Sequence, residues 1–294
     1  MALPFADARN HAFPEAGFLQ EPEMSFHPAL PPAQWPRLEN GWVWLCGAGP
    51  GDPGLLTLHA LNALRQADVI VHDALVNEDI LDWAPQARRI HAGKRGGKPS
   101  AKQADICDTL IDLARQGLRV LRLKGGDPFT FGRGAEEARA LMDAGVPLKV
   151  VPGITSGIGG LAYAGIPLTE RGTNQAVTFV TGHDADGGLS ASVDWQALAK
   201  VSGTIVVYMG MKHAQAISDA LIAGGRSADE PVAVVMAAST DTQRVLETTL
   251  GTLDADIRAA GLEPPALLAI GKSVLIEGEA APRVRRAAYA IAAE

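Results

Sequence analysis

The chain has 294 residues, enough for one large domain or for two smaller domains that each bury a core. Hydrophobic residues make up 47% and charged residues 20%, which excludes a disordered protein, and the net charge of −7 argues against broad nucleic-acid binding. Two cysteines, Cys46 and Cys107, are too few for a disulfide framework, and Cys46, in an apolar strand, is expected to be a buried reduced thiol. No apolar run is long enough to cross a membrane, and no signal peptide is evident, so we expect a cytoplasmic protein.

Residues 1–40 contain many prolines and no hydrophobic period, which predicts an extended or disordered N-terminal arm. From residue 41 on, short apolar strands alternate with amphipathic helices, a pattern typical of a parallel sheet. The strands expected here are 42–46, 68–72, 89–92, 120–123 and 148–151. The expected helices are 55–67, 77–83, 101–115 and one that ends at Gly145. Pro152 and Gly153 then mark a boundary, which makes 41–152 an N-terminal α/β domain.

Residues 153–294 are expected to form a C-terminal α/β domain with a different rhythm. Helices are expected at 155–164, at 212–223 and between the last two of five strands; these strands are 176–181, 204–208, 231–236, 244–249 and 266–270. Strands that follow each other without a full crossover predict a mixed sheet. The fold class is therefore two α/β domains, one mostly parallel and one mixed, with the active-site cleft between them.

The densest motif follows the strand at 120–123. Gly125 and Gly126 allow a ligand to approach the backbone, and Asp127 supplies an acceptor suited to ribose hydroxyls or an ammonium group. Arg133, just ahead of the next helix, could hold a carboxylate with its planar guanidinium group. Ligands bind at the carboxyl ends of parallel strands, so this stretch predicts a binding site.

A second glycine-rich turn, Gly47-Ala-Gly-Pro-Gly51, invites a dinucleotide interpretation, with Asp73 as the ribose-binding acid. The fingerprint Gly-x-Gly-x-x-Gly is broken because Asp52 occupies the third glycine position, and Pro50 lacks an amide for a pyrophosphate. A nicotinamide-dependent oxidoreductase therefore stays an alternative, next to a purely structural turn.

The positive charges gather in the loops at strand ends, which indicates a polyanionic ligand in an otherwise acidic protein; they are Lys94, Arg95, Lys98, Lys102, Arg122, Lys124, Arg133 and Arg171. His183 ends a strand and is kept as a site residue, and Met209 could line a flat pocket. The histidines lack the spacing of metal ligands, so no metal is expected.

Several motifs in order resemble the tetrapyrrole methylases, the class III S-adenosylmethionine-dependent enzymes. The resemblance covers about residues 41–275 and is carried by the segments 43–57, 71–76, 93–95, 123–134, 151–156, 165–169, 180–183 and 208–210. Within the superfamily, Gly93-Lys-Arg95 and Phe131-Gly-Arg-Gly134 look like the uroporphyrinogen-III C-methyltransferases. The sequences Asp73-Ala-Leu-Val76 and Gly93-Lys-Arg-Gly-Gly-Lys-Pro-Ser100 look like the cobalamin-pathway branch of these enzymes.

The resemblance implies two methyl transfers from S-adenosylmethionine to uroporphyrinogen III, at C2 and then C7, which give precorrin-2 and S-adenosylhomocysteine. It also implies a homodimer and a role in cobalamin- or siroheme-type biosynthesis, with no metal, nucleic acid or membrane involved. Methylation of a later corrin intermediate is the alternative within the family. A distant relative modifies ribosomal RNA, which the net charge of −7 disfavours.

The resemblance also implies site residues. The family's cofactor positions fall on Pro50, Gly125, Gly126, Asp127, Thr130, Thr155, Ser156, Met209, Ala238 and Ala266. Its substrate and catalytic positions fall on Asp73, Lys94, Arg122, Arg133, Glu136, Arg171, His183 and Met209. Of these, Asp73 is a candidate base, and Lys94 is a candidate acid or a partner for a carboxylate. Many relatives have Arg where Ala74 stands and His where Glu170 stands, and the first departure removes one carboxylate contact.

Overall fold

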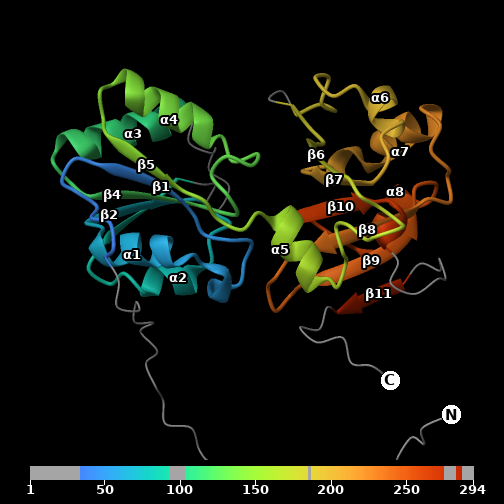
Figure 1. The fold of residues 1–294 in the computed structure, drawn as a ribbon, viewed down its shortest axis with the longest axis horizontal. Helices are drawn as coiled ribbons and strands as arrows, with labels where there is room; N and C mark the ends of the chain where they lie inside the picture. Colours follow the sequence, from blue (N-terminus) through green and yellow to red (C-terminus); the bar gives the residue numbers. More distant parts are fainter. Residues whose placement is uncertain (1–33, 93–102, 185–186, 275–282, 287–294) are drawn as a thin grey trace, which may run out of the picture.

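The computed structural model of the chain describes residues 34–92, 103–184, 187–274 and 283–286. These residues form two β-sheets, one from each half of the sequence, and helix α5 (Ser156–Tyr163) lies between them (Figure 1). Each strand expected from the sequence is present at or next to its expected position. The expectation of one parallel and one mixed α/β unit is confirmed.

The first sheet is parallel throughout and has the strand order β3-β2-β4-β1-β5. Its strands are β1 (Val43–Gly47), β2 (Val69–His72), β3 (Arg88–His91), β4 (Val120–Lys124) and β5 (Leu148–Val151). Parallel strands place all their carboxyl ends at one edge of the sheet. The loops that follow β4, β1 and β5 are therefore neighbours at that edge.

Helices cover both faces of the first sheet, as Figure 1 shows. Trp44 of β1 packs with Leu64 on the face of α1 (Leu58–Gln66) and α2 (Glu78–Asp82). Leu45 faces the other way and packs with Leu110 beneath α3 (Gln103–Arg115) and α4 (Gly134–Asp143). Burial on both faces explains why the strands read as continuous apolar runs in the sequence.

The second sheet is mixed, with the strand order β11-β9-β8-β10-β7-β6. Only β6 and β7 are parallel neighbours, and the other pairs are antiparallel. The strands are β6 (Val177–Thr181), β7 (Thr204–Tyr208), β8 (Pro231–Met236), β9 (Arg244–Thr249), β10 (Ala266–Ile270) and β11 (Arg283–Arg286). Because β10 runs against β7 and β8, its beginning lies at the same edge as their ends.

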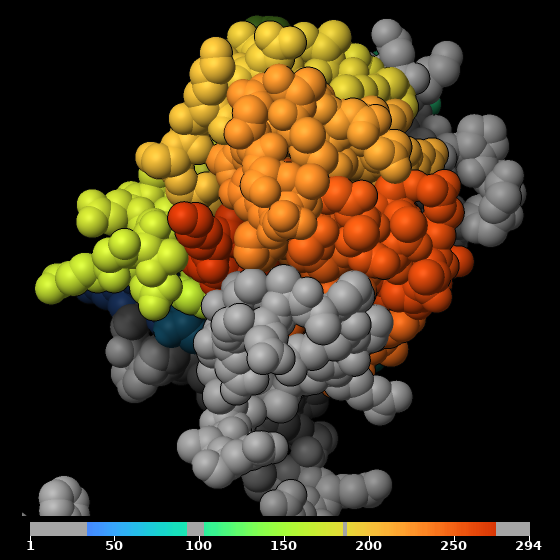
Figure 2. All heavy atoms as spheres, turned by 90° about the vertical axis from the view of Figure 1, so that its right-hand side faces the viewer, coloured from blue at the N-terminus to red at the C-terminus, as the bar shows by residue number. Residues whose placement is uncertain are grey.

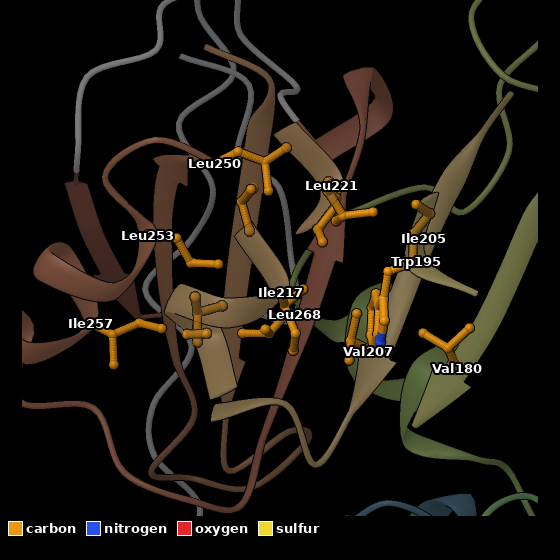
Figure 3. Packing of buried hydrophobic residues seen from close by; sticks show 14 of the residues in the cluster. Val180, Trp195, Ile205, Val207, Ile217, Leu221, Leu250, Leu253, Ile257 and Leu268 are labelled. Carbon is orange, nitrogen blue, oxygen red and sulfur yellow. The ribbon is translucent and has the colours of Figure 1, made fainter. Parts of the chain in front are cut away.

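The second sheet also carries helices on both faces. One face packs against α6 (Trp195–Ala199), α7 (Ala214–Ala223) and α8 (Leu253–Ala260), where Figure 3 shows Ile217 next to Leu268. The opposite face packs against α5, with Leu161 in a cluster with Val206. The buried side of α5 thus packs on the second sheet.

Two elements were not predicted from the sequence, α6 and β11. Helix α6 is only five residues long, too short to show a helical period, and it begins at Asp194, whose side chain accepts a hydrogen bond from Ala197 N. Strand β11 pairs with β9 at the edge of the sheet, and its sequence, Arg-Val-Arg-Arg, contains one apolar residue. Neither element carries the alternation on which sequence interpretation depends.

The end of the expected N-terminal arm packs on the first domain. Leu38 is buried, and its amide donates to Gln66 Oε1 of α1 at 3.0 Å. Pro36 O accepts from Asn62 Nδ2 at 2.8 Å. The amides of α1 thus hold this part of the arm in an extended form, whereas residues 1–33 lie outside the described part.

Two expectations drawn from composition can be compared with the structure. Cys46 and Cys107 are both free and buried, and burial raises the pKa of the Cys46 thiol. The expectation of a buried reduced thiol at Cys46 is confirmed. Across the described ranges, no helix combines the length and the apolarity needed to span a membrane.

The start of the first sheet generates a test. Asp68, just before β2, accepts from Arg119 N and Nε at 2.8 and 3.0 Å, and these bonds lower the pKa of its carboxyl group. A carboxyl group whose pKa is lower in the folded protein stabilises the fold at pH values above its unfolded pKa of about 3.9. This contribution is lost as the pH falls through the pKa of the folded protein. We expect Asp68→Asn to lower the free energy of unfolding by about 1 kcal/mol at pH 7, because the pair is partly screened by solvent, and by much less below about pH 3.

Urea unfolding followed by circular dichroism at both pH values measures this difference. Asp112→Asn, on an exposed position of α3, is the matched control and should change stability little at either pH. An Asp68→Asn effect of equal size at both pH values would contradict the assignment to this ion pair.

Candidate active site

Three loops of the first sheet touch through glycines at the carboxyl ends of β1, β4 and β5. Gly49 and Gly126 exchange backbone hydrogen bonds of 3.2 and 2.7 Å. A Cβ atom added at Gly47 or at Gly153 would collide with the carbonyl oxygen of Gly126. The three strand ends can approach this closely only because the chain has no side chains there.

Asp127 ties two of these loops together. Its Oδ2 accepts from Gly153 N at 3.0 Å, and its Oδ1 accepts from Phe129 N at 2.8 Å and from Thr130 Oγ1 at 3.2 Å. Both carboxylate oxygens therefore have partners within the protein. The sequence suggested Asp127 as an acceptor for a ligand, and the structure adds a part in holding the loop.

The strand-end loops of the second sheet close on the same place. A Cβ atom on Gly159 of α5 would lie 3.0 Å from Pro50 Cγ, and one on Gly160 would lie 2.5 Å from Ala238 Cβ. The amide of Asp52 donates to Ser239 Oγ at 3.2 Å, which connects the loops after β1 and β8. The candidate site thus lies where the two domains meet.

Tyr208, the last residue of β7, contacts both the start of α5 and the loop after β4. Its hydroxyl lies 2.7 Å from Thr155 Oγ1 and accepts from Gly157 N at 2.8 Å at the start of α5, while burial raises its pKa. The ring of Phe131 packs against it with 4.8 Å between centroids. The next residue, Met209, is 44% exposed beside this pair.

Backbone strain is concentrated in these loops. Non-glycine residues with positive φ in the described ranges all follow β4, β7 or β8; they are Phe131, Arg133, Met209, Ala237 and Ser239. Each such residue costs energy that the surrounding structure must offset, and residues of this kind cluster at binding and catalytic sites. The strain marks the same region as the glycine contacts.

Beside Gly125 lies a buried group of four charged side chains. Arg122 is 1% exposed and Glu137 is fully buried, and Arg122 Nη2 lies 2.5 Å from Asp73 Oδ1 and 3.0 Å from Glu137 Oε1. Lys124 Nζ lies 3.0 Å from Glu137 Oε1 and 3.5 Å from Asp73 Oδ2. Burial works against the charge of Arg122, but the two carboxylates raise its pKa above the ordinary value. Of the four, only Asp73 is substantially exposed, at 32% of its side chain.

Arg133 and Glu136 form a different kind of pair. Two parallel hydrogen bonds join Arg133 Nε and Nη2 to the carboxylate of Glu136, at 2.9 and 2.7 Å, and both side chains are exposed. These bonds raise the pKa of Arg133 and lower that of Glu136. An exposed pair of this kind contributes little to stability, so Arg133 can exchange Glu136 for another carboxylate at small cost.

The structure brings most of the predicted cofactor positions together. Contacts already described join Pro50, Gly126, Asp127, Thr130, Thr155 and Ala238, and Gly125, Ser156 and Met209 adjoin them in sequence. Ala266 begins β10 and pairs with Met236, two residues before Ala238. His183 follows Gly182, whose amide donates to Tyr208 O at 2.7 Å. His183 is therefore next to Met209.

Two predicted substrate positions, Arg122 and Arg171, lie apart from this group. Arg122 is enclosed by Asp73 and Glu137, so its guanidinium group faces these carboxylates and not an open surface. Lys94 lies outside the described residues. Arg171 is in the turn closed by Glu170 and Asn174, and Asn174 donates to Thr204 Oγ1 at the start of β7.

Arg171 is thus at the edge of the second sheet opposite to Met209, a strand length of about 16 Å away. Figure 2 shows the yellow-green stretch that contains this turn at the left-hand side of the view. In this single chain Arg171 does not join the other candidate side chains.

Sequence reasoning did not identify Glu137, Tyr208 or Ser239 as site residues. Glu137 had a detectable signal, because it lies on the stripe of α4 that buries Ala138 and Leu141, where a carboxylate needs a partner. Tyr208 and Ser239 act through contacts between distant segments, and the spacing of the sequence does not show those.

The geometry can now be compared with known proteins. Residues 43–254 match the family described as Tetrapyrrole (Corrin/Porphyrin) Methylases, which is most of the chain. The chain belongs to this family. The glycine-rich turn after β1 is therefore part of a methylase fold, and the nicotinamide alternative is not favoured.

Individual members of the family are similar in sequence to this chain. The chain is 65% identical to a uroporphyrinogen-III C-methyltransferase of Sinorhizobium sp over 240 residues, which are 81% of this chain and 86% of that protein. It is 49% identical to a siroheme synthase of Chromobacterium violaceum over 80% of this chain, but it spans 50% of that protein's length.

A solved structure matches the fold. The uroporphyrin-III C-methyl transferase of Thermus thermophilus complexed with S-adenyl homocysteine is 40% identical and superposes with a TM-score of 0.68. The match covers 79% of this chain and 98% of that one. In the described part of this chain, His, Cys, Asp and Glu side chains form no group of three that could hold a metal ion.

The loop contacts of Asp127 generate a prediction. Asp127→Ala removes the acceptors of two backbone amides, Gly153 N and Phe129 N, and should lower the free energy of unfolding by about 1–3 kcal/mol. Asp127→Asn keeps one acceptor oxygen, so its free energy of unfolding should lie between those of the wild type and Asp127→Ala. Urea unfolding of the three proteins measures the order, and equal stability of wild type and Asp127→Ala would show that these bonds do not hold the loop.

Proposed function

We propose that this chain is an S-adenosylmethionine-dependent methyltransferase that methylates uroporphyrinogen III at C2 and C7 to give precorrin-2. The observation that carries the proposal is the 65% identity to a uroporphyrinogen-III C-methyltransferase over 86% of that protein. The convergence of the predicted cofactor positions at one place in the fold supports it. The competing proposal within the family, methylation of a later corrin intermediate, is not favoured by these relatives.

The strand-end loops fit S-adenosylmethionine. The glycine contacts leave bare backbone around Gly125 and Gly126, where a nucleoside can approach amides and carbonyls. Exposed apolar side chains, Phe131 and Met209, stand beside them, next to the Thr155 end of α5. We propose that Pro50, Gly125, Gly126, Asp127, Thr130, Thr155, Ser156, Met209, Ala238 and Ala266 hold the cofactor. When bound, it supplies a methyl group on a positively charged sulfur.

The charges around the site fit a polyanion. Uroporphyrinogen III carries eight carboxylates, and the exposed Arg133 can hold one of them in the bidentate manner in which it now holds Glu136. Ala74, the exposed neighbour of Asp73, stands at a position where many relatives carry Arg. Arg133 therefore has to supply more of the binding to the substrate carboxylates. We propose that Glu136 keeps Arg133 oriented until the substrate arrives, and that Lys94 and His183 bind further groups of the substrate.

The chemistry requires that an electron-rich pyrrole carbon meets the methyl group in line and that a proton leaves the macrocycle. Positioning supplies most of the rate when the donor is already activated. Asp73 is the candidate base, because its carboxylate is partly exposed beside Gly125 and Leu75. A base with this placement can take the proton without moving into the core.

The resemblance to the family also supports a homodimer that works in the cytoplasm, within cobalamin- or siroheme-type biosynthesis. Light scattering at micromolar concentration tests the assembly, and a mass of one chain would contradict it. The arrangement of the described strands in two sheets supports the proposed domains, 41–152 and 153–294, and limited proteolysis near residue 152 would test the boundary.

The direct test is incubation of the pure protein with S-adenosylmethionine and enzymatically made uroporphyrinogen III. Mass spectrometry should show a product with two added methyl groups. A trimethylated product, or no methylated product, would overturn the assignment, and turnover of a later corrin intermediate alone would favour the competing proposal.

Arg133→Lys tests the orienting role. Lysine keeps the charge but loses the planar pair of donors, so the substrate should still bind while its ring carbon is misplaced. Because a displacement of about 1 Å can cost on the order of 100-fold in rate, we expect kcat to fall at least about tenfold. Affinity for S-adenosylhomocysteine, measured by calorimetry, should stay near the wild-type value.

Arg139→Lys is the matched control, because Arg139 is an exposed arginine on the same helix, α4. It should keep both kcat and affinity. Wild-type turnover in Arg133→Lys would show that Arg133 contributes only general positive potential.

A further inference from the structure

The buried charges beside Gly125 form a closed chain of contacts. Arg122 Nε and Nη2 donate to Glu137 Oε1 at 3.2 and 3.0 Å, and Lys124 Nζ donates to the same oxygen at 3.0 Å. Both cations also reach Asp73, at 2.5 and 3.5 Å. The order is carboxylate, two cations, carboxylate, with Glu137 at the closed end and Asp73 at the end that reaches solvent.

The four charged side chains depend on one another because most of them are buried. Two cations with exposures of 3% or less are tolerated only because two carboxylates compensate them. Helix α3 adds a neutral donor, Gln103 Nε2, to Glu137 Oε1 at 3.0 Å. The other oxygen of Glu137, Oε2, is buried and has no hydrogen-bond partner among the described residues. An unpaired buried carboxylate oxygen calls for an explanation, and a role in the site next to it is one.

We infer that Glu137 is a positioning residue for the methyl-transfer reaction, which holds Asp73 in place through Arg122 and Lys124 without touching the substrate. The inference rests on the proposed function, because turnover is its main readout. Glu137 fixes one side of both cations, and this leaves their other side to hold the Asp73 carboxylate at the strand edge. Its negative charge also cancels one of the two buried positive charges.

Removal of this charge has two opposite consequences. In Glu137→Gln the side chain keeps its shape, but Asp73 alone faces two cations and is drawn toward them, so it becomes a poorer and less accessible base. The same excess positive charge attracts a substrate with eight carboxylates more strongly. We therefore expect kcat to fall about tenfold while KM for uroporphyrinogen III stays unchanged or falls.

Restoring the charge balance should restore turnover. Lys124→Met removes one cation and leaves an excess negative charge, so kcat should fall and KM should rise. In the double variant Glu137→Gln/Lys124→Met, Arg122 and Asp73 again form a neutral pair, and kcat should exceed that of either single variant several-fold. Loss of folded protein would lower the apparent kcat of all variants. It would not make KM change in opposite directions in Glu137→Gln and Lys124→Met.

Steady-state kinetics of the full chain with both substrates, together with calorimetric titration of S-adenosylhomocysteine and thermal unfolding, make the test. Glu247→Gln is the matched control, because Glu247 is a buried glutamate of β9 in the second sheet. If Glu137→Gln does not fold, the comparison of Lys124→Met with the double variant carries the test.

The outcomes separate the two proposals. If the wild type does not methylate uroporphyrinogen III, the proposed function is wrong. If the wild type is active and Glu137→Gln has the same kcat, or if the double variant is no faster than the single variants, the positioning role of Glu137 is wrong.

Discussion

The close approach of three strand ends at Gly47, Gly126 and Gly153 is the constraint on which the rest of the structure depends. A single Cβ atom at Gly47 or Gly153 would force the loops after β1, β4 and β5 apart. Because they stay in contact, Asp127 can reach Gly153 N, and the chain after it must turn sharply. Phe131 and Arg133 adopt left-handed conformations in that turn, and the Phe131 ring packs against Tyr208 of the second sheet.

The site uses charge in two ways that burial separates. Arg122 and Lys124 are enclosed and neutralised by carboxylates, so they act on whatever binds mainly through Asp73. Arg133 is exposed and bound to Glu136, a partner that a ligand carboxylate can replace. Only the second kind can follow a substrate in and out, because breaking a buried pair leaves an uncompensated charge. The gathering of cations in strand-end loops therefore does not mean that each of them contacts a polyanion.

The sequence predicted the strands and most helices because both sheets are built from regular apolar segments, and it missed α6, which is too short to have a period. Glycine-rich loops such as 125–127 were recognised as a site because parallel strands end at one edge. The partner of Arg122 was not recognised, since Glu137 meets it only when α4 packs on β4. Arg171 was grouped with the other cations by its neighbouring glycine, and the topology of β6 and β7 places it at the other end of the sheet.

The two halves meet through the site itself. Each hydrophobic cluster among the described residues lies within one half: two belong to the first sheet and two to the second. The connections across the junction include a hydrogen bond from Asp52 N to Ser239 Oγ, the close contact of Gly159 with Pro50, and the ring contact of Phe131 with Tyr208. Since no shared apolar core fixes the angle between the sheets, the loops that would hold a ligand also set the arrangement of the halves. A ligand bound among these loops contacts both halves at once, and its binding energy acts directly on their relative position.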